Sequence, residues 1–116
     1  MDASILVALL RRARLLCGSE AALQRSIEDT LATAGVSFER EVRLGPADRI
    51  DFLAAAGVGI EAKVRYPRRS IYRQLERYAQ HDAIAALVLV TGTALGLPPA
   101  INGKPLFFVS IGRSAL

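Results

Sequence analysis

Hydrophobic and charged residues alternate with a period of two over residues 49–65, on both sides of a short glycine-containing turn. The hydrophobic positions are Ile50, Phe52, Ile60, Ala62 and Val64, and the charged positions are Arg49, Asp51, Glu61, Lys63 and Arg65. This pattern predicts two antiparallel strands with one buried face and one charged face. A turn centred on Ala56 places Asp51 directly opposite Glu61, with Lys63 on the same face. Facing carboxylates repel, so the pair costs stability unless a cation lies between them.

Two helical patterns precede this hairpin. Residues 3–16 are rich in apolar residues and end in an arginine cluster, with Gly18 as the stop. Ser19 is a good N-cap for a second helix, which we expect to run to about Ala34 and to end at Gly35. Glu20 lies near the middle of that helix's apolar stripe, which consists of Leu23, Ile27, Leu31 and Ala34. The Glu20 carboxylate either favours the helix N-terminus through the dipole or belongs to a site on the sheet.

The apolar surface of the first helix is wide for a small protein. Ile5, Leu6, Leu9 and Leu10 contribute to it, with Leu16 beyond. We expect this surface to pack on the core, and the alternative is a dimer contact.

The remaining segments complete a mixed sheet. Residues 36–44 are strand-like, with Glu39 and Glu41 on one face and Val36, Phe38, Val42 and Leu44 on the other. Ser70 caps a third predicted helix over about 71–82, and the wholly apolar run 84–90 reads as a strand covered on both faces. Residues 92–104 are expected to form a loop, and residues 106–111 a last strand. The predicted fold is α/β, with three antiparallel strands, a crossover helix, a parallel strand and an extra C-terminal strand, flanked by helices.

Length and charge narrow the class of protein. With 116 residues, of which 52% are hydrophobic, the chain forms one domain over 1–116, with a core of about 18–91. The net charge is +4, and basic residues concentrate between Lys63 and Arg77, which suits a polyanion. The single cysteine, Cys17, excludes an internal disulfide and predicts a reducing, cytoplasmic location, and no segment suggests a membrane span.

The charged face of the hairpin suits a magnesium site. Mg²⁺ takes oxygen ligands, keeps several waters and needs only one or two protein carboxylates. Asp51 and Glu61 offer these, and the backbone carbonyl of Ala62 offers a third oxygen. Lys63 would orient a water or a phosphate, and Glu20 would reach in from the second helix. Glu39 and Glu41 are rival ligands, although a solvated strand face paired with arginines explains them equally.

Asp51 followed by Glu61-Ala62-Lys63, in the order helix, three strands, helix, strand, resembles the core of the PD-(D/E)XK nuclease superfamily. The opening Ser19-Glu20-Ala21-Ala22-Leu23-Gln24 is similar to the first-helix acidic motif of its small VRR-Nuc and Holliday-junction-resolvase-like members. Gln74-Leu75-Glu76-Arg77-Tyr78 resembles the Gln-x-x-x-Tyr motif of the RecB-type branch. One departure is the absence of a proline directly before Asp51.

The resemblance implies an Mg²⁺-dependent DNA endonuclease, with Mn²⁺ able to substitute. Asp51 and Glu61 would be the metal ligands, Lys63 the catalytic lysine and Glu20 the helix acid. Gln74 and Tyr78 would contact substrate or organise the site. The basic residues Arg65, Arg68, Arg69, Arg73 and Arg77 would bind the DNA backbone.

The sequence therefore leaves two hypotheses about function, from different classes of protein. The first is a metal-dependent deoxyribonuclease that works as a homodimer or as a subunit of a larger complex. The second is a non-catalytic nucleic-acid-binding or assembly module with a nuclease-like fold. A binding module has no need for two carboxylates on a surface meant for phosphates, so the residues favour the enzyme.

Overall fold

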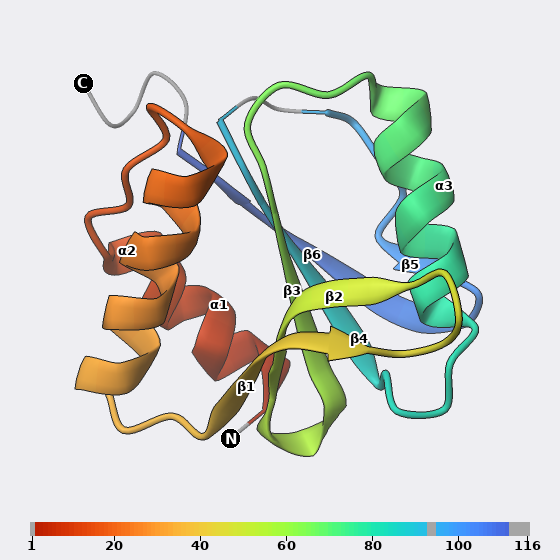
Figure 1. Ribbon diagram of the computed structural model, residues 1–116, viewed down its shortest axis with the longest axis horizontal. Coiled ribbons are helices and arrows are strands. Elements are labelled where there is room, and N and C mark those ends of the chain that lie inside the picture. Colours follow the sequence, from red (N-terminus) through yellow and green to blue (C-terminus); the bar gives the residue numbers. More distant parts are fainter. Residues whose placement is uncertain (1, 93–94, 112–116) are drawn as a thin grey trace.

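The computed structural model describes residues 2–92 and 95–111 and contains one mixed six-stranded sheet (Figure 1). In spatial order the strands are β1 (Phe38–Arg43), β2 (Arg49–Ala54), β3 (Val58–Lys63), β4 (Ala86–Thr91), β6 (Lys104–Ser110) and β5 (Ala100–Ile101). Strands β1, β2 and β3 are antiparallel neighbours, whereas β3, β4 and β6 are parallel to one another. The predicted α/β fold with a mixed sheet is confirmed.

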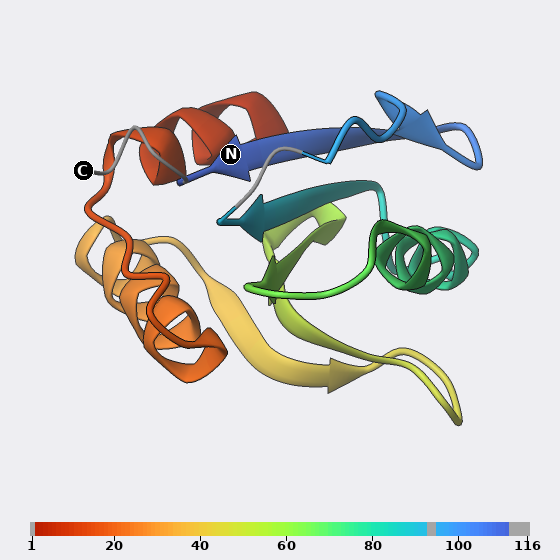
Figure 2. The ribbon, with the colours of Figure 1, turned by 90° about the horizontal axis from the view of Figure 1, so that it is seen from above.

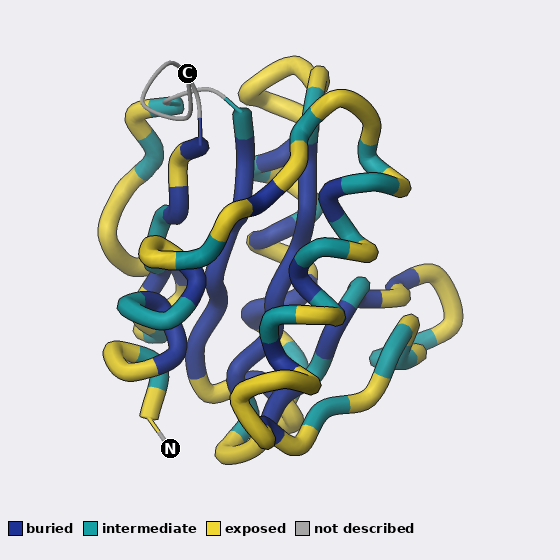
Figure 3. The backbone as a smooth tube through the Cα atoms, turned by 90° about the vertical axis from the view of Figure 1, so that its left-hand side faces the viewer, coloured by how far each residue is buried: buried dark blue, intermediate teal, exposed yellow. Residues whose placement is uncertain are grey.

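Three helices cover the two faces of this sheet. Helices α1 (Ala3–Arg12) and α2 (Glu20–Thr33) pack on one face, and α3 (Arg68–Ala79) packs on the other (Figure 2). Each face has its own apolar core, one centred on Leu23, Ile27 and Phe52 and the other on Leu75 and Tyr78. Strands β3 and β4 lie between the two cores and are buried along their whole length (Figure 3).

The first helix is shorter than predicted. It ends at Arg12, because Ala13 adopts an extended conformation, and residues 13–16 leave the helix. Its apolar side packs on β4 and β6 through Leu6, Val7 and Leu10, as expected, although Ile5 stays exposed. The dimer contact stays a prediction. No helix among residues 2–92 and 95–111 is long and apolar enough to cross a membrane.

Helix α2 follows its predicted capping, with the Ser19 hydroxyl accepting from the Ala22 N–H and Gly35 at a φ of 73°. The predicted stripe is buried except for Ala34, which lies beyond the last helical residue and is exposed. Helix α3 begins at Arg68 and not after Ser70, since the Pro67 carbonyl accepts the Ile71 N–H and closes the first turn.

The C-terminal part departs from prediction in one element. Ala100–Ile101 forms β5, a two-residue strand that pairs with the start of β6 around Asn102-Gly103. Both turn residues have positive φ, 56° and 78°, as a tight hairpin turn requires. Residues 92–104 are therefore not all loop, and the last strand starts at Lys104 rather than Leu106. Thr93 and Ala94, within the predicted loop, lie outside the described residues.

Strands β1 and β2 change face in the middle. Phe52 packs in the core beneath α1 and α2, but Ile50 packs in the core beneath α3, although a regular strand would put both on one face. Val42 likewise packs on the α3 side, so the predicted common faces are wrong. The change falls at Glu41 and Asp51, which are not paired with each other in the β1–β2 ladder. Glu41 has a left-handed φ of 50°, which breaks the regular pleat there.

Candidate active site

The candidate site lies at the carboxyl ends of β3 and β4, where α2 and α3 both begin (Figure 1). Ligands of open α/β sheets commonly bind at such an edge, in the crevice between helices on opposite faces. Lys63 is the last residue of β3 and Glu20 the first of α2. The fold thus brings Glu20 of α2, Asp51 of β2 and Lys63 of β3 to one place.

Asp51 occupies a gap in the backbone hydrogen-bond ladder. The β2–β3 register pairs Phe52 with Ile60 and Ala54 with Val58, and its continuation sets Asp51 opposite Glu61, as predicted. The Asp51 N–H donates to Glu61 Oε1 at 3.2 Å, and the Asp51 carboxylate accepts the Ala62 N–H at 2.8 Å. The ladder is therefore replaced here by side-chain hydrogen bonds that fix both carboxylates. Because the N–H and C=O of one strand residue point to the same side, the Ala62 carbonyl also faces Asp51.

Lys63 completes a buried charged group with these carboxylates. Its Nζ lies 3.3 Å from Glu61 Oε2 and 4.3 Å from the centre of the Tyr66 ring. Glu61 is only 3% exposed and Lys63 only 8%, because α3 covers them. The predicted exposed, charged face of this strand is wrong: both faces of β3 are buried.

The carboxylates carry more negative charge than their surroundings balance. Burial, and next the charge of Asp51, raises the pKa of Glu61 to about 7. Burial also raises the pKa of Asp51, and the charge of Glu20 adds to this, while the Ala62 N–H, Lys63 and Arg40 act against it. An added cation beside these two carboxylates would relieve the repulsion between them.

Glu20 points into the same region from α2. Its Oε1 atom is buried and has no hydrogen-bond partner among the residues that the structure describes. A buried carboxylate oxygen without a partner is costly, and a cation or its coordinated water would satisfy it. The helix-dipole account of Glu20 leaves this oxygen unexplained.

The donor set suits Mg²⁺. Within residues 2–92 and 95–111, no group of three or more histidine, cysteine, aspartate or glutamate side chains is arranged as a metal site. Two carboxylates and the Ala62 carbonyl nevertheless meet the need of Mg²⁺, which completes its shell with water. The unpartnered Glu20 oxygen and the raised pKa of Glu61 both fit a hydrated cation at this point.

A pocket of about 350 Å³ adjoins Lys63 beneath the start of α3. Its lining comprises Lys63, Tyr66, Ser70, Ile71, Arg73, Gln74 and Arg77, and it contains no acidic residue. The predicted substrate residues Arg73, Gln74 and Arg77 therefore lie around the same pocket as Lys63. Arg68 and Arg69 line a different pocket with Tyr72.

Tyr78 is fully buried, so among its predicted roles the geometry favours organising the site. Its hydroxyl donates to the Arg49 carbonyl at 2.9 Å, two residues before Asp51. Burial raises the pKa of Tyr78, and the Glu61 and Asp51 carboxylates raise it further, which keeps the phenol protonated. The exposed Glu39 and Glu41 lie on the outer side of β1, where Glu41 is 3.7 Å from Arg49 and 3.9 Å from Arg40.

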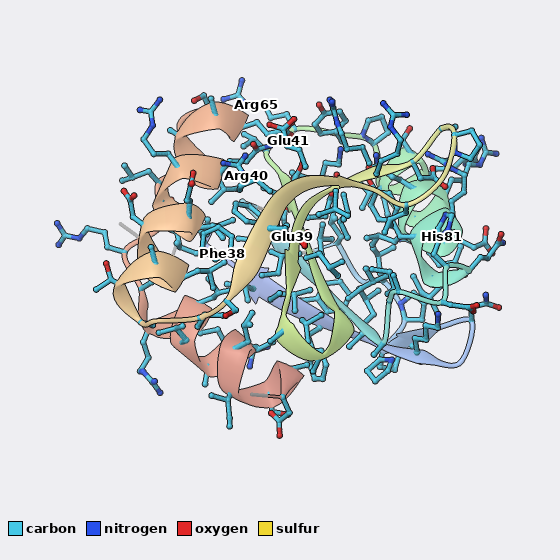
Figure 4. All side chains as sticks on the ribbon, turned by 60° about the horizontal axis from the view of Figure 1, so that its bottom comes forward. Phe38, Glu39, Arg40, Glu41, Arg65 and His81 are labelled. Atoms are coloured by element: carbon cyan, nitrogen blue, oxygen red, sulfur yellow. The ribbon has the colours of Figure 1, made fainter. Side chains whose placement is uncertain are left out.

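Sequence reasoning missed Arg40. This residue lies on the side of β1 that faces α2, where Figure 4 shows it between that helix and the strand. Its guanidinium binds Glu28 Oε1 at 2.8 Å and Gln24 Oε1 at 2.7 Å, and its Nε donates to the Asp51 carbonyl at 3.4 Å. The available signal was an arginine at an inward position between Phe38 and Val42.

Sequence reasoning also missed a second cluster, at the start of β2. Asp48 accepts from Arg77 Nε at 2.9 Å and binds His81 Nε2 at 3.0 Å. Lys104 Nζ donates to the His81 carbonyl at 2.8 Å. The hydrogen bonds from His81 and Arg77 lower the pKa of Asp48. This cluster joins the β1–β2 turn to α3, and His81 lies far from Arg40 and Glu41 (Figure 4).

The fold and these side chains define an α/β domain with a mixed six-stranded sheet, in which the half-buried Asp51 meets the buried Glu61 and Lys63 at the carboxyl edge. Comparison with known proteins gives no match to a family model, a curated protein or a solved structure.

Proposed function

We propose that this chain is an Mg²⁺-dependent deoxyribonuclease of the PD-(D/E)XK type that hydrolyses phosphodiester bonds. The observation that carries the proposal is the pair formed by the buried Glu61 and the half-buried Asp51, beside which Lys63 lies. Burying such a group costs free energy that neither core packing nor helix capping requires. A divalent cation with a bound phosphate would offset that cost.

Each residue then has a role that its position supports. Asp51, Glu61 and the Ala62 carbonyl would hold the cation, with Glu20 binding it through water. The bound Mg²⁺ supplies Lewis-acid stabilisation and makes a coordinated water more acidic. Lys63 holds a positive charge beside the scissile phosphate, where negative charge develops in the transition state.

The basic residues after β3 would bind the DNA backbone. The pocket beside Lys63 offers hydrogen-bond donors from Arg73, Gln74 and Arg77 close to the reacting phosphate. Arg65, Arg68 and Arg69 are exposed along the β3–α3 connection and the first turn of α3. Contacts of this kind recognise phosphates and not base sequence, so they suit a substrate chosen by DNA structure.

A cleavage panel tests the proposal. Purified protein is incubated with linear, branched and single-stranded DNA in Mg²⁺ or Mn²⁺, and with a chelator. We expect cleavage that Lys63→Ala and Asp51→Ala each reduce by about a thousandfold or more, because each removes transition-state stabilisation. Glu39→Ala, which changes an exposed carboxylate on β1, is the matched control and should cleave normally. Metal-dependent cleavage that persists in both site variants would refute the assignment.

A non-catalytic nucleic-acid-binding or assembly module is the second candidate. The observation that favours it is the Lys63–Glu61 ion pair at 3.3 Å, which already satisfies the lysine without a substrate. Its expected signature is salt-sensitive DNA binding with no turnover in any divalent metal. In that case Lys63→Ala would leave DNA affinity unchanged.

A further inference from the structure

We infer that Arg40 is a positioning residue for the site, which couples α2 to the Asp51 backbone and so sets where the Asp51 carboxylate lies. The inference concerns the geometry of Asp51, and its metal-affinity test rests on the proposed function. Arg40 lies outside the Asp51, Glu61 and Lys63 group, on the opposite side of the hairpin from α3.

The hydrogen bonds of Asp51 make such a residue necessary. In the gap at Glu41 and Asp51 the regular ladder supplies no partner for the Asp51 backbone. Its N–H is satisfied by Glu61, and its C=O accepts from Arg40 Nε at 3.4 Å. Two charged side chains from different strands therefore hold this residue.

Arg40 is itself fixed in several directions. The Nη1 and Nη2 groups bind Glu28 and Gln24 of α2 at 2.8 and 2.7 Å, and the guanidinium carbon lies 4.5 Å from the centre of the Phe52 ring. A planar guanidinium can make these contacts together, whereas a lysine ammonium is a single point of charge. The position of α2 is thereby transmitted to Asp51 through one rigid group.

The connection also links two acids of the site. Helix α2 begins at Glu20 and bears Gln24 on its next turn, so Arg40 joins the helix that carries Glu20 to the strand that carries Asp51. An ion pair in solvent would not need several fixed hydrogen-bond partners around the arginine. The side chain of Arg40 is only 28% exposed, which marks a partly desolvated contact.

The Ala62 amide gives a readout that requires no metal. Its N–H donates to Asp51 Oδ2 at 2.8 Å, so its proton chemical shift reports the position of that carboxylate. We expect Arg40→Gln to move the Ala62 amide proton upfield, because the hydrogen bond lengthens. Arg40→Lys should do the same, because lysine retains the charge but cannot make the several planar hydrogen bonds of the guanidinium group. The matched control is Arg43→Gln, an exposed arginine on the same strand whose Nη1 donates to the Pro46 carbonyl.

Mn²⁺ affinity, measured by calorimetry without DNA, is the second readout. Arg40→Gln and Arg40→Lys should weaken binding about tenfold, as loss of a group that orients a ligand does. The variant Asp51→Asn distinguishes the proposed metal site from the proposed role of Arg40. Failure of the wild type to bind Mn²⁺, or equal binding by Asp51→Asn, would defeat the metal site of the proposed function, and the Ala62 shift would still decide the role of Arg40.

The inference is overturned if the Ala62 amide proton is unmoved in Arg40→Gln, or if Arg40→Lys restores the wild-type shift and affinity. The first result would show that Asp51 keeps its place without Arg40, and the second that charge alone suffices. Should Arg40→Gln fail to fold, Gln24→Ala removes one guanidinium contact from the helix side. It should shift the same proton in the same direction by a smaller amount, and an unchanged proton in that variant also overturns the inference.

Discussion

Asp48 and Asp51 are three residues apart, yet their surroundings differ in opposite ways. Asp48, just before β2, binds both Arg77 and His81, and their hydrogen bonds lower its pKa. Asp51 is half-buried beside the buried Glu61, and desolvation raises its pKa. The first carboxylate is balanced by its neighbours, whereas the second lies where negative charge exceeds positive charge.

The difference separates a structural carboxylate from a candidate functional one. A balanced carboxylate joins two parts of the fold, here the β1–β2 turn and the end of α3. An unbalanced pair lowers stability and persists where another property is selected, such as affinity for a cation. Whether neighbouring charges balance a carboxylate therefore says more about its role than the identity of the residue does.

The strongest way to test this contrast is the pH dependence of stability. The Glu61 pKa is about 7 in the folded chain, against an ordinary value of 4.5. Between these values the folded chain keeps a proton that the unfolded chain has released, so the free energy of unfolding should fall as pH rises. The decrease across this window should be on the order of a few kcal/mol. Urea unfolding in metal-free buffer at a series of pH values measures it.

Glu61→Gln is the control for this experiment, because glutamine has a similar shape and no titration. Its free energy of unfolding should be nearly flat over the same window. An equal slope in Glu61→Gln and wild type would show that the buried pair is not the source of the pH dependence.

A smaller effect is expected at the balanced carboxylate. Asp48→Asn should lower the free energy of unfolding by about 1–2 kcal/mol at neutral pH, since charge-assisted hydrogen bonds to Arg77 and His81 are weakened and the cluster is partly exposed. The Asp48 contribution is present above the unfolded pKa of 3.8 and is lost as pH falls through the lowered folded value. Denaturant unfolding, together with a cleavage assay, checks both parts.

Cleavage by Asp48→Asn should remain near the wild-type rate. If this variant loses activity and keeps its stability, the two aspartates have the reverse of the roles argued above.

The smallest expected effect concerns the exposed arginines that we propose bind DNA. Arg77 is exposed but binds Asp48, whereas Arg68 and Arg69 line a separate surface pocket at the start of α3. Replacing Arg68 and Arg69 by glutamine should leave stability unchanged and reduce the slope of log affinity against log salt by about 0.9 per lost phosphate contact. Filter binding of DNA at several salt concentrations measures the slope. A large loss of stability, or a wild-type slope, would contradict a role at the DNA surface.

Local patterns predicted much of the fold. The alternation around the Gly57 turn and the Ser19 cap depend on neighbouring residues only, so the hairpin register and the start of α2 could be read directly. The proximity of Asp51, Glu61 and Lys63 follows from that register. The burial of Glu61 and Lys63 does not, because α3 supplies the cover from later in the chain.

Other features required the tertiary structure. The face change arises at Glu41, a residue type that rarely adopts positive φ, so no turn signal marks it. Asp48 resembles an ordinary turn residue in Gly45-Pro46-Ala47-Asp48, while its partners lie 29 and 33 residues later. Such long-range partners leave no local pattern.

Gly59 shows how closely the core beneath α3 packs against β3. It lies on the face of β3 that also bears Glu61 and Lys63, and a Cβ atom there would come within 2.5 Å of Ile50 Cδ1 and 3.0 Å of Ile84 Cδ1. Gly59→Ala would therefore force the ends of the Ile50 and Ile84 side chains to move. Because Ile50 directly precedes Asp51 in the chain, thermal unfolding and cleavage of Gly59→Ala would show whether repacking this core also changes the site.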